Sequence, residues 1–265
     1  MPQTVSLLGL PTDVNSSHLR GAAKAPAEIR RALWSGASNL TSESGIDLST
    51  PDALIDEGDL ELREDAQDRG RIESRIRRIL EEGRKPLSLG GDHSITCPVM
   101  RAIAAKHPGV SILHFDAHPD LYEAYEGNRF SHACPFARIM EERLAKRLVQ
   151  AGIRTLNAHQ AEQAKRFGVE IVTADRFEAE DVPIPAGPLY ITIDLDALDP
   201  AFAPGVAHRE PGGLSVRDIL RVLRRVEGPV VGADIVELRP ASDTDGMTAV
   251  VAAKLAKELA GLMRR

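Results

Sequence analysis

Two patterns of apolar residues alternate along the chain. Short runs rich in apolar residues, typical of strands buried on both faces of a parallel sheet, occupy residues 4–10, 53–56, 86–89, 112–115, 150–155, 169–173, 189–193 and 229–236. Between them, apolar side chains recur at helical spacing and predict helices over residues 25–34, 67–82, 94–106, 136–149, 158–167, 215–226 and 247–263. This alternation predicts a mainly parallel sheet with helices on both faces. No repeat or change of composition marks a linker, so we expect residues 1–265 to form a single domain.

Composition and charge narrow the class of protein. The chain is 43% hydrophobic and 27% charged, as is usual for a soluble globular protein. Its formal net charge of −6 argues against nucleic acid binding, and its apolar runs are too short for a membrane span. The two cysteines, Cys97 and Cys134, cannot build a disulfide framework or a four-thiolate zinc site. The first residues lack the pattern of a secretory signal, so we expect a cytoplasmic protein.

Polar side chains gather just after four of the predicted strands. They are His93 after residues 86–89; Asp116, His118 and Asp120 after 112–115; Asp194 and Asp196 after 189–193; and Glu237 after 229–236. In open α/β sheets, ligands bind outside the carboxyl ends of the strands. One such motif alone is often a solvated turn. If the four strands are neighbours, however, all of these groups meet at one edge of the sheet.

The aspartates of this group indicate bound metal. Two like charges 4 Å apart repel by about 4 kcal/mol at an effective dielectric constant of 20, so four carboxylates together require cations. Two divalent ions would balance four aspartates. Oxygen and imidazole ligands without thiolate favour Mn²⁺, or Fe, Co or Ni, over a structural zinc site. A two-metal site activates a shared water, which indicates hydrolysis at an electrophilic carbon or phosphorus.

Two further residues are candidates for substrate chemistry. Glu237 is not needed to balance two metal ions, so it is free to bind a cationic substrate such as a guanidinium group; alternatively, it pairs with Arg239 at the surface. His132 is a candidate proton carrier because imidazole titrates near neutral pH, although a loop histidine is often only solvated. His18 could reach the site from its loop. We expect the other histidines to be structural or solvent-exposed: His107, His114, His159 and His208.

The motifs at residues 90–94, 116–120, 194–200 and 236–237 resemble, in order and spacing, those of the ureohydrolase (arginase/agmatinase) family. Residues 7–30, 125–141, 152–170, 199–218 and 230–259 resemble its plant-type arginase branch, so the likeness covers nearly the whole chain. The resemblance implies a three-layer α/β/α sandwich with a central eight-stranded sheet, assembled as a hexamer or trimer. It also implies two Mn²⁺ per subunit and cleavage of a guanidino group to urea and an amine.

The resemblance also assigns roles by position. The implied metal ligands are His93, Asp116, His118, Asp120, Asp194 and Asp196. Asp120 would also accept a proton from the bridging water, His132 would be the acid–base residue, and Glu237 would bind the guanidinium group. All of these residues are present, which disfavours a non-catalytic metal-binding scaffold. A metallophosphoesterase is a remote alternative, because its motifs normally occur in another order.

The tail of the substrate is the open question. Plant-type resemblance favours L-arginine, giving L-ornithine and urea. At the position where animal arginases hold the α-amino group with a carboxylate, this chain has Asn157. Asn128, Arg129 and Ser131 are then candidates for binding the carboxylate of arginine. Two acidic residues of the same loop, Glu123 and Glu126, would instead suit the ammonium group of agmatine, and another guanidino acid also remains open.

Overall fold

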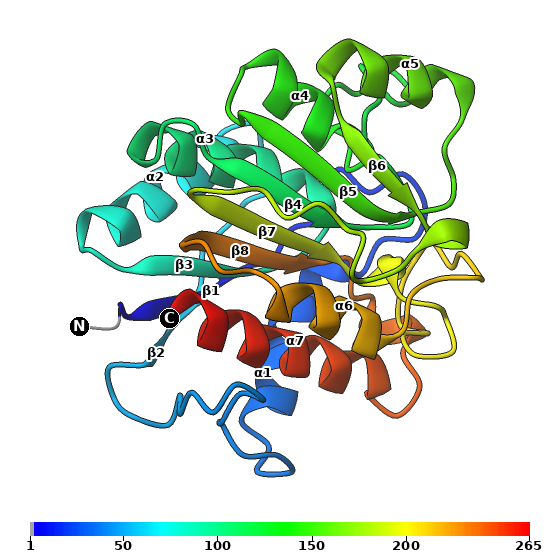
Figure 1. Ribbon diagram of the computed structural model, residues 1–265. Coiled ribbons are helices and arrows are strands. Elements are labelled where there is room, and N and C mark those ends of the chain that lie inside the picture. The colour runs from blue at the N-terminus through cyan, green and yellow to red at the C-terminus, as the bar shows by residue number, and fades with distance from the viewer. Residues whose placement is uncertain (1–2) are drawn as a thin grey trace.

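The central sheet has eight strands in the order β2-β1-β3-β8-β7-β4-β5-β6, all parallel, in a computed structural model that describes residues 3–265 (Figure 1). The strands are β1 (Val5–Leu10), β2 (Leu54–Asp59), β3 (Lys85–Gly90), β4 (Ser111–Phe115), β5 (Arg147–Ile153), β6 (Glu170–Thr173), β7 (Leu189–Asp194) and β8 (Val230–Val236). The predicted sheet of eight mainly parallel strands is confirmed.

Helices cover both faces of the sheet and complete three layers (Figure 1). On one face lie α1 (Ala25–Leu33), α6 (Val216–Arg224) and α7 (Met247–Met263); on the other lie α2 (Asp68–Glu81), α3 (Thr96–Lys106), α4 (Pro135–Glu141) and α5 (Ala158–Phe167). Successive strand residues point to opposite faces, so Leu7 and Leu113 join one buried cluster while Leu8 and Ile112 join the other. Within residues 3–265, no helix is long and apolar enough to cross a membrane.

The helix predicted over residues 136–149 is too long, and this prediction is corrected by the structure. Helix α4 ends at Glu141, and Arg143 has a φ of 55°, which no right-handed helix accommodates. From Arg147 the chain enters β5, where Leu148 and Val149 are fully buried. The charged stretch before them continues a helical spacing in the sequence, but its apolar residues belong to the sheet.

The four central strands of the sheet are β3, β8, β7 and β4, in that order. These are the strands that the polar motifs follow in the sequence. Because the strands are parallel, their carboxyl ends lie at the same edge of the sheet. The topology therefore delivers the motifs at residues 92–93, 116–120, 194–196 and 237 to one place.

Candidate metal centre and catalytic cavity

The turn after β3 places His93 at the centre of the site. Asp92 begins this turn, and its carboxylate accepts a hydrogen bond from the N–H of Ser94 at 3.1 Å. Asp92 thus caps a short 3-10 helix over His93–Ile95, and α3 begins at Thr96, two residues after the predicted start at residue 94. His93 is fully buried, and its N–H donates to Glu237 Oε1 at 2.9 Å. This hydrogen bond joins the ends of β3 and β8.

Three carboxylates converge on the His93 ring. Its Nδ1 atom lies 3.2 Å from Asp116 Oδ2, 3.2 Å from Asp120 Oδ2 and 3.3 Å from Asp194 Oδ2. Nevertheless, this buried nitrogen has no hydrogen-bond partner among the described residues. Its Nε2 atom lies 3.0 Å from the hydroxyl of Thr192. A nitrogen facing three carboxylate oxygens without a hydrogen bond is the arrangement expected where a cation is shared.

A second group of donors surrounds His118. Its Nδ1 atom lies 3.0 Å from Asp196 Oδ2 and 3.4 Å from Asp116 Oδ1. Local hydrogen bonds hold the two turns in place. The Asp194 carboxylate accepts from the Asp196 N–H at 2.8 Å, and the Asp116 carboxylate accepts from the His118 N–H at 2.6 Å. Asp116 thus lies between the two imidazoles, and the structure brings all six predicted ligands together.

The charge balance of the cluster also fits bound cations. Burial would lower the pKa of His93, but the surrounding carboxylates raise it well above its usual value. Burial, and then the charges of Asp196 and Asp116, raise the pKa of Asp194 far above the ordinary range. Burial and Asp116 likewise raise the pKa of Asp120 to about 7. The protein alone therefore ionises this cluster poorly, whereas two divalent cations would stabilise all of its carboxylates.

His132 and Glu237 form a pair beside this cluster. The His132 Nδ1 atom lies 2.8 Å from Glu237 Oε1, and both side chains are buried. Glu237 follows β8 directly with a φ of 68°, a conformation that costs a non-glycine residue about 1–3 kcal/mol. Its N–H donates to the carbonyl of Gly91 at 2.8 Å, which holds this turn in place. The strained turn aims the carboxylate at His93 and His132.

The loop after β1 fixes the other side of the His132 ring. The Ser17 N–H lies 3.1 Å from His132 Nε2, and the Ser17 hydroxyl oxygen lies 2.8 Å from the same nitrogen. Because an N–H only donates, Nε2 carries the lone pair in the neutral ring, and the single proton of that ring is on Nδ1, facing Glu237. Burial would lower the pKa of His132, but Glu237 raises it to about 9. A second proton at Nε2 has to displace the Ser17 N–H.

A cavity of about 260 Å³ opens over the cluster. Small cavities of this kind suit a small metabolite. Its lining residues come from several loops: Ser17, His118, Asp120, Tyr122, Tyr125, His132, Ala133, Thr155, Gln160, Asp194, Asp196, His208, Glu210 and Glu237. The site therefore combines the candidate metal ligands, the His132–Glu237 pair and an outer wall that contains the carboxylate of Glu210.

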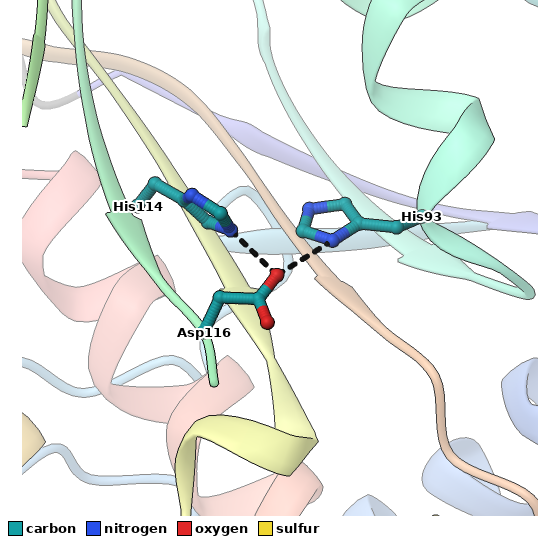
Figure 2. Close-up of side chains that lie close together, drawn as sticks. All are labelled: His93, His114 and Asp116. Carbon is teal, nitrogen blue, oxygen red and sulfur yellow. Dashed lines mark hydrogen bonds and ion pairs between the residues drawn. The ribbon is translucent and has the colours of Figure 1, made fainter. Parts of the chain in front are cut away.

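Two of the histidines that were expected to be structural or solvent-exposed lie at the site. His208 lines the cavity, with its ring centroid 5.3 Å from that of His132 and 5.7 Å from that of His118; burial lowers its pKa to about 4. His208 lies in a loop rich in glycine and proline, residues 201–213, where no sequence pattern predicted a place in the cavity. His114 is buried in β4 with Nε2 2.8 Å from Asp116 Oδ2 (Figure 2), and its position two residues before Asp116 on one strand was a usable signal.

The residues predicted to bind the substrate tail do not line the cavity. Asn128 donates to Asn15 Oδ1 at 3.1 Å, and Arg129 pairs with Glu141 at 3.0 Å. Ser131 accepts from the Ala133 N–H at 3.3 Å. Asn157 caps α5, and Glu123 pairs with Arg166 at 3.0 Å. Each of these polar groups already has a partner within the protein.

The fold and site together are those expected of a metal-dependent α/β hydrolase: an open parallel sheet whose central strands bring six oxygen and imidazole donors to one cavity. The sequence profile of the Arginase family matches residues 3–261, and the chain belongs to this family.

Relatives are similar to the chain over nearly its whole length. Arginase 1, mitochondrial, of Arabidopsis thaliana is 50% identical over 275 residues, covering 97% of this chain and 80% of the relative. The solved structure of arginase from Medicago truncatula superposes with a TM-score of 0.94 at 45% identity, covering 100% of this chain and 88% of that one. Agmatinase of Bacillus anthracis is 33% identical, covering 96% of this chain and 90% of the relative.

The expectation of a cytoplasmic location is wrong. The relatives of Arabidopsis thaliana and Oryza sativa are mitochondrial proteins by name, as is one of Medicago truncatula. A low cysteine count and the lack of a secretory pattern fit any reducing compartment, so they did not distinguish the cytoplasm from an organelle.

Proposed function

We propose that this protein is a manganese-dependent arginase that hydrolyses L-arginine to L-ornithine and urea. The observation that carries the proposal is the convergence of six candidate metal ligands with the His132–Glu237 pair in one cavity. The identity to plant arginases over nearly the whole chain supports arginine as the substrate. The entire chain, residues 1–265, would act as one catalytic unit.

The donor set suits Mn²⁺. The ligands would be the carboxylates and imidazoles of His93, Asp116, His118, Asp120, Asp194 and Asp196. Hard oxygen donors with two imidazoles and no thiolate are typical of manganese sites. When bound, two such ions lower the pKa of a water molecule and supply hydroxide at neutral pH.

Glu237 would hold the guanidinium group. Its Oε1 atom accepts hydrogen bonds from the His93 N–H and from His132, while Oε2 receives none from the described residues. Burial favours the neutral acid, but the charge of His132 lowers the pKa of Glu237, so it stays ionised. A buried carboxylate with one open oxygen binds a planar cation strongly and fixes its orientation.

Proton transfer would fall to Asp120 and His132. Asp120 lines the cavity, where its carboxylate would be placed to take a proton from water and release it again. The amine that leaves the guanidino carbon needs a proton, and His132 stands at the cavity wall with an imidazole to deliver it. Glu237 would connect substrate binding with the delivery of this proton, because it would hold the guanidinium group and it contacts His132.

Agmatine is the second candidate substrate. Glu210 lines the cavity, and its side chain is 39% exposed, which places a carboxylate near solvent. Among the described lining residues there is no lysine or arginine to pair with a substrate carboxylate. An acidic outer wall favours the ammonium tail of agmatine, whereas arginine would use Glu210 for its α-amino group only.

Urea release from arginine, agmatine and 4-guanidinobutyrate tests the proposal, each assayed with Mn²⁺ and with a chelator. We expect activity that depends on Mn²⁺ and is highest on arginine. Higher kcat/KM on agmatine would identify an agmatinase, and no urea from any of the three would refute the proposed reaction. Glu210→Gln is the matched probe of the tail, since it keeps the metal ligands.

We also propose that the protein is a homo-oligomer, a hexamer or a trimer. Exposed apolar side chains support this, among them Met247 and Val250 on α7, and Phe202, with 48%, 58% and 42% of their surface accessible. Light scattering of the purified protein tests it, and a monomer at working concentration would contradict it.

A further inference from the structure

The buried ring of His114 is hydrogen-bonded at both nitrogens. On β4, its Nε2 atom lies 2.8 Å from Asp116 Oδ2, the oxygen that also faces His93 (Figure 2). On the neighbouring strand β5, Gln150 is its register partner, and the Gln150 amide nitrogen lies 3.0 Å from His114 Nδ1. His114 therefore connects β5 to Asp116, a candidate metal ligand.

The Pro119 carbonyl settles which nitrogen of His114 carries the proton. It lies 2.7 Å from the amide nitrogen of Gln150, and because a carbonyl oxygen only accepts, this contact fixes the amide orientation. The same amide nitrogen donates to His114 Nδ1, which must then carry the lone pair. The ring proton is on Nε2 and is donated to Asp116 Oδ2.

This protonation state decides between two roles for His114. His93, His114 and Asp116 are close enough together to hold a metal ion as a group of three. A protonated Nε2, however, has no lone pair to offer a cation. His114 is therefore a hydrogen-bond donor to a ligand and not a ligand itself.

Resting on the metal centre proposed above, we propose that His114 and Gln150 are a positioning pair that orients the Asp116 carboxylate toward the proposed metal site. Asp116 is then held from both sides: His114 donates to Oδ2, and the His118 N–H donates to Oδ1 at 2.6 Å. Each oxygen keeps a further lone pair for a cation. Pro119 belongs to the ligand turn itself, so the chain of hydrogen bonds returns to the segment that it orients.

Manganese binding by two histidine variants tests this role. In His114→Asn the amide is too short to reach Asp116, whereas in His114→Gln its nitrogen takes the place of Nε2. We expect the full-length wild-type protein to bind two Mn²⁺ per subunit. His114→Asn should weaken binding about 10- to 100-fold, the usual effect of losing such a partner, and His114→Gln should recover most of it. Equilibrium dialysis with elemental analysis measures both affinity and stoichiometry.

Gln150→Leu is the second variant. It removes the group that fixes the His114 proton, so Mn²⁺ affinity should fall in the wild-type background but not in His114→Gln. Thermal unfolding of the metal-free variants is the control, because both histidine variants lose the stacking of His114 on Phe136, whose ring centroid lies 4.0 Å away. A structural role alone would affect the Asn and Gln variants equally.

Three results would overturn the inference. They are unchanged Mn²⁺ affinity in His114→Asn, an equal loss in His114→Asn and His114→Gln, and loss of one ion per subunit at saturating Mn²⁺ in both, which would make His114 a ligand. A wild-type protein that binds no Mn²⁺ would instead refute the proposed metal centre, so the two failures are distinguishable.

Discussion

The Nδ1 atom of His132 lies 2.8 Å from Oε1 of Glu237, at the wall of the cavity above the candidate metal ligands. Neither residue is near the other in sequence, and their contact depends on the loop after β4 folding back over the end of β8. The pair couples two tasks. The carboxylate that would bind the substrate also sets the proton affinity of the imidazole that would act on it.

Replacing Glu237 by glutamine should impair substrate binding and leave the metal in place. The amide cannot supply the negative charge, and a hydrogen bond to a charged group contributes about 1.5–3 kcal/mol, so we expect kcat/KM to fall about 10- to 100-fold. Manganese content should equal that of the wild type, because Glu237 is not a predicted ligand. Loss of metal in this variant would show that the glutamate has been misassigned.

The same substitution should move the pH dependence of the reaction. Ionised Glu237 raises the pKa of His132 to about 9, and burial opposes it. Without that charge the pKa must fall, so the protonated imidazole disappears at a lower pH. In kcat/KM profiles, we expect the alkaline limb of Glu237→Gln to shift toward neutral pH, and Glu210→Gln to leave it where it is. If the alkaline limb were identical in Glu237→Gln and the wild type, the group that titrates in this limb would not be His132.

Removing a ligand should abolish both activity and stabilisation by metal. Asp196 Oδ2 lies 3.0 Å from His118 Nδ1, and we expect Asp196→Ala and His118→Ala to lose nearly all urea release. Because Mn²⁺ would bind only the folded protein, a concentration of 100 times its Kd should stabilise the wild type by about 2.7 kcal/mol for each ion bound. Thermal unfolding with and without Mn²⁺ measures this, and an unchanged Tm in the wild type would count against the centre.

The sequence predicted the sheet well because buried strands leave a local signal. The runs at residues 189–193 and 229–236 are continuous and apolar, and they correspond to β7 and β8. The end of α4 was missed because Arg143, not a glycine, adopts the left-handed conformation there. The order of the strands is set by long-range pairing, which short patterns do not contain.

The candidate ligands could be found because each follows a strand at a fixed spacing. Asp116, His118 and Asp120 are neighbours in sequence, and parallel strands bring the remaining ligands to them. His208 and Glu210 could not be found in this way, since they reach the cavity from an irregular loop. Arg129 had the right charge for the substrate tail, but its pairing with Glu141 is decided by tertiary structure.

Glu43 should stabilise the fold only above acidic pH. It pairs with Arg217 at 2.7 Å and with Lys254 at 3.0 Å, and the hydrogen bond from Arg217, followed by that from Lys254, lowers its pKa to about 2. Its contribution is therefore complete above the usual pKa of 4.5 and is lost as the pH falls toward 2. Since Glu43 is partly exposed, we expect Glu43→Gln to cost about 1 kcal/mol at most at pH 7.

Urea unfolding of Glu43→Gln and wild type at pH 7, and at the lowest pH where both stay folded, measures this difference. The gap in unfolding free energy should narrow at the lower pH. A gap that stays the same or widens on acidification would contradict a stabilising role for ionised Glu43.

Two glycine-to-alanine substitutions should have opposite effects on stability. A Cβ atom at Gly91 would overlap the carbonyl oxygen of Thr12, a backbone atom that cannot rotate away. The neighbouring Asp92 N–H donates to that same oxygen at 2.9 Å, and the Gly91 carbonyl accepts the Glu237 N–H. Gly91→Ala must therefore separate the loop after β1 from the turn that carries His93. We expect a loss of at least the 1–3 kcal/mol or so typical of overpacking, together with weaker Mn²⁺ binding.

Gly70 is the matched control for that substitution. It is an exposed residue of α2, and a Cβ there would meet no atom within 4 Å. Alanine has the higher helix propensity, so Gly70→Ala should stabilise the protein by up to about 1 kcal/mol and leave Mn²⁺ affinity unchanged. Denaturant unfolding of the metal-free proteins measures the change in stability, and equilibrium dialysis measures the Mn²⁺ affinity. If Gly91→Ala behaved like Gly70→Ala in both, close packing of the β1 loop against the β3 turn would not be what positions His93.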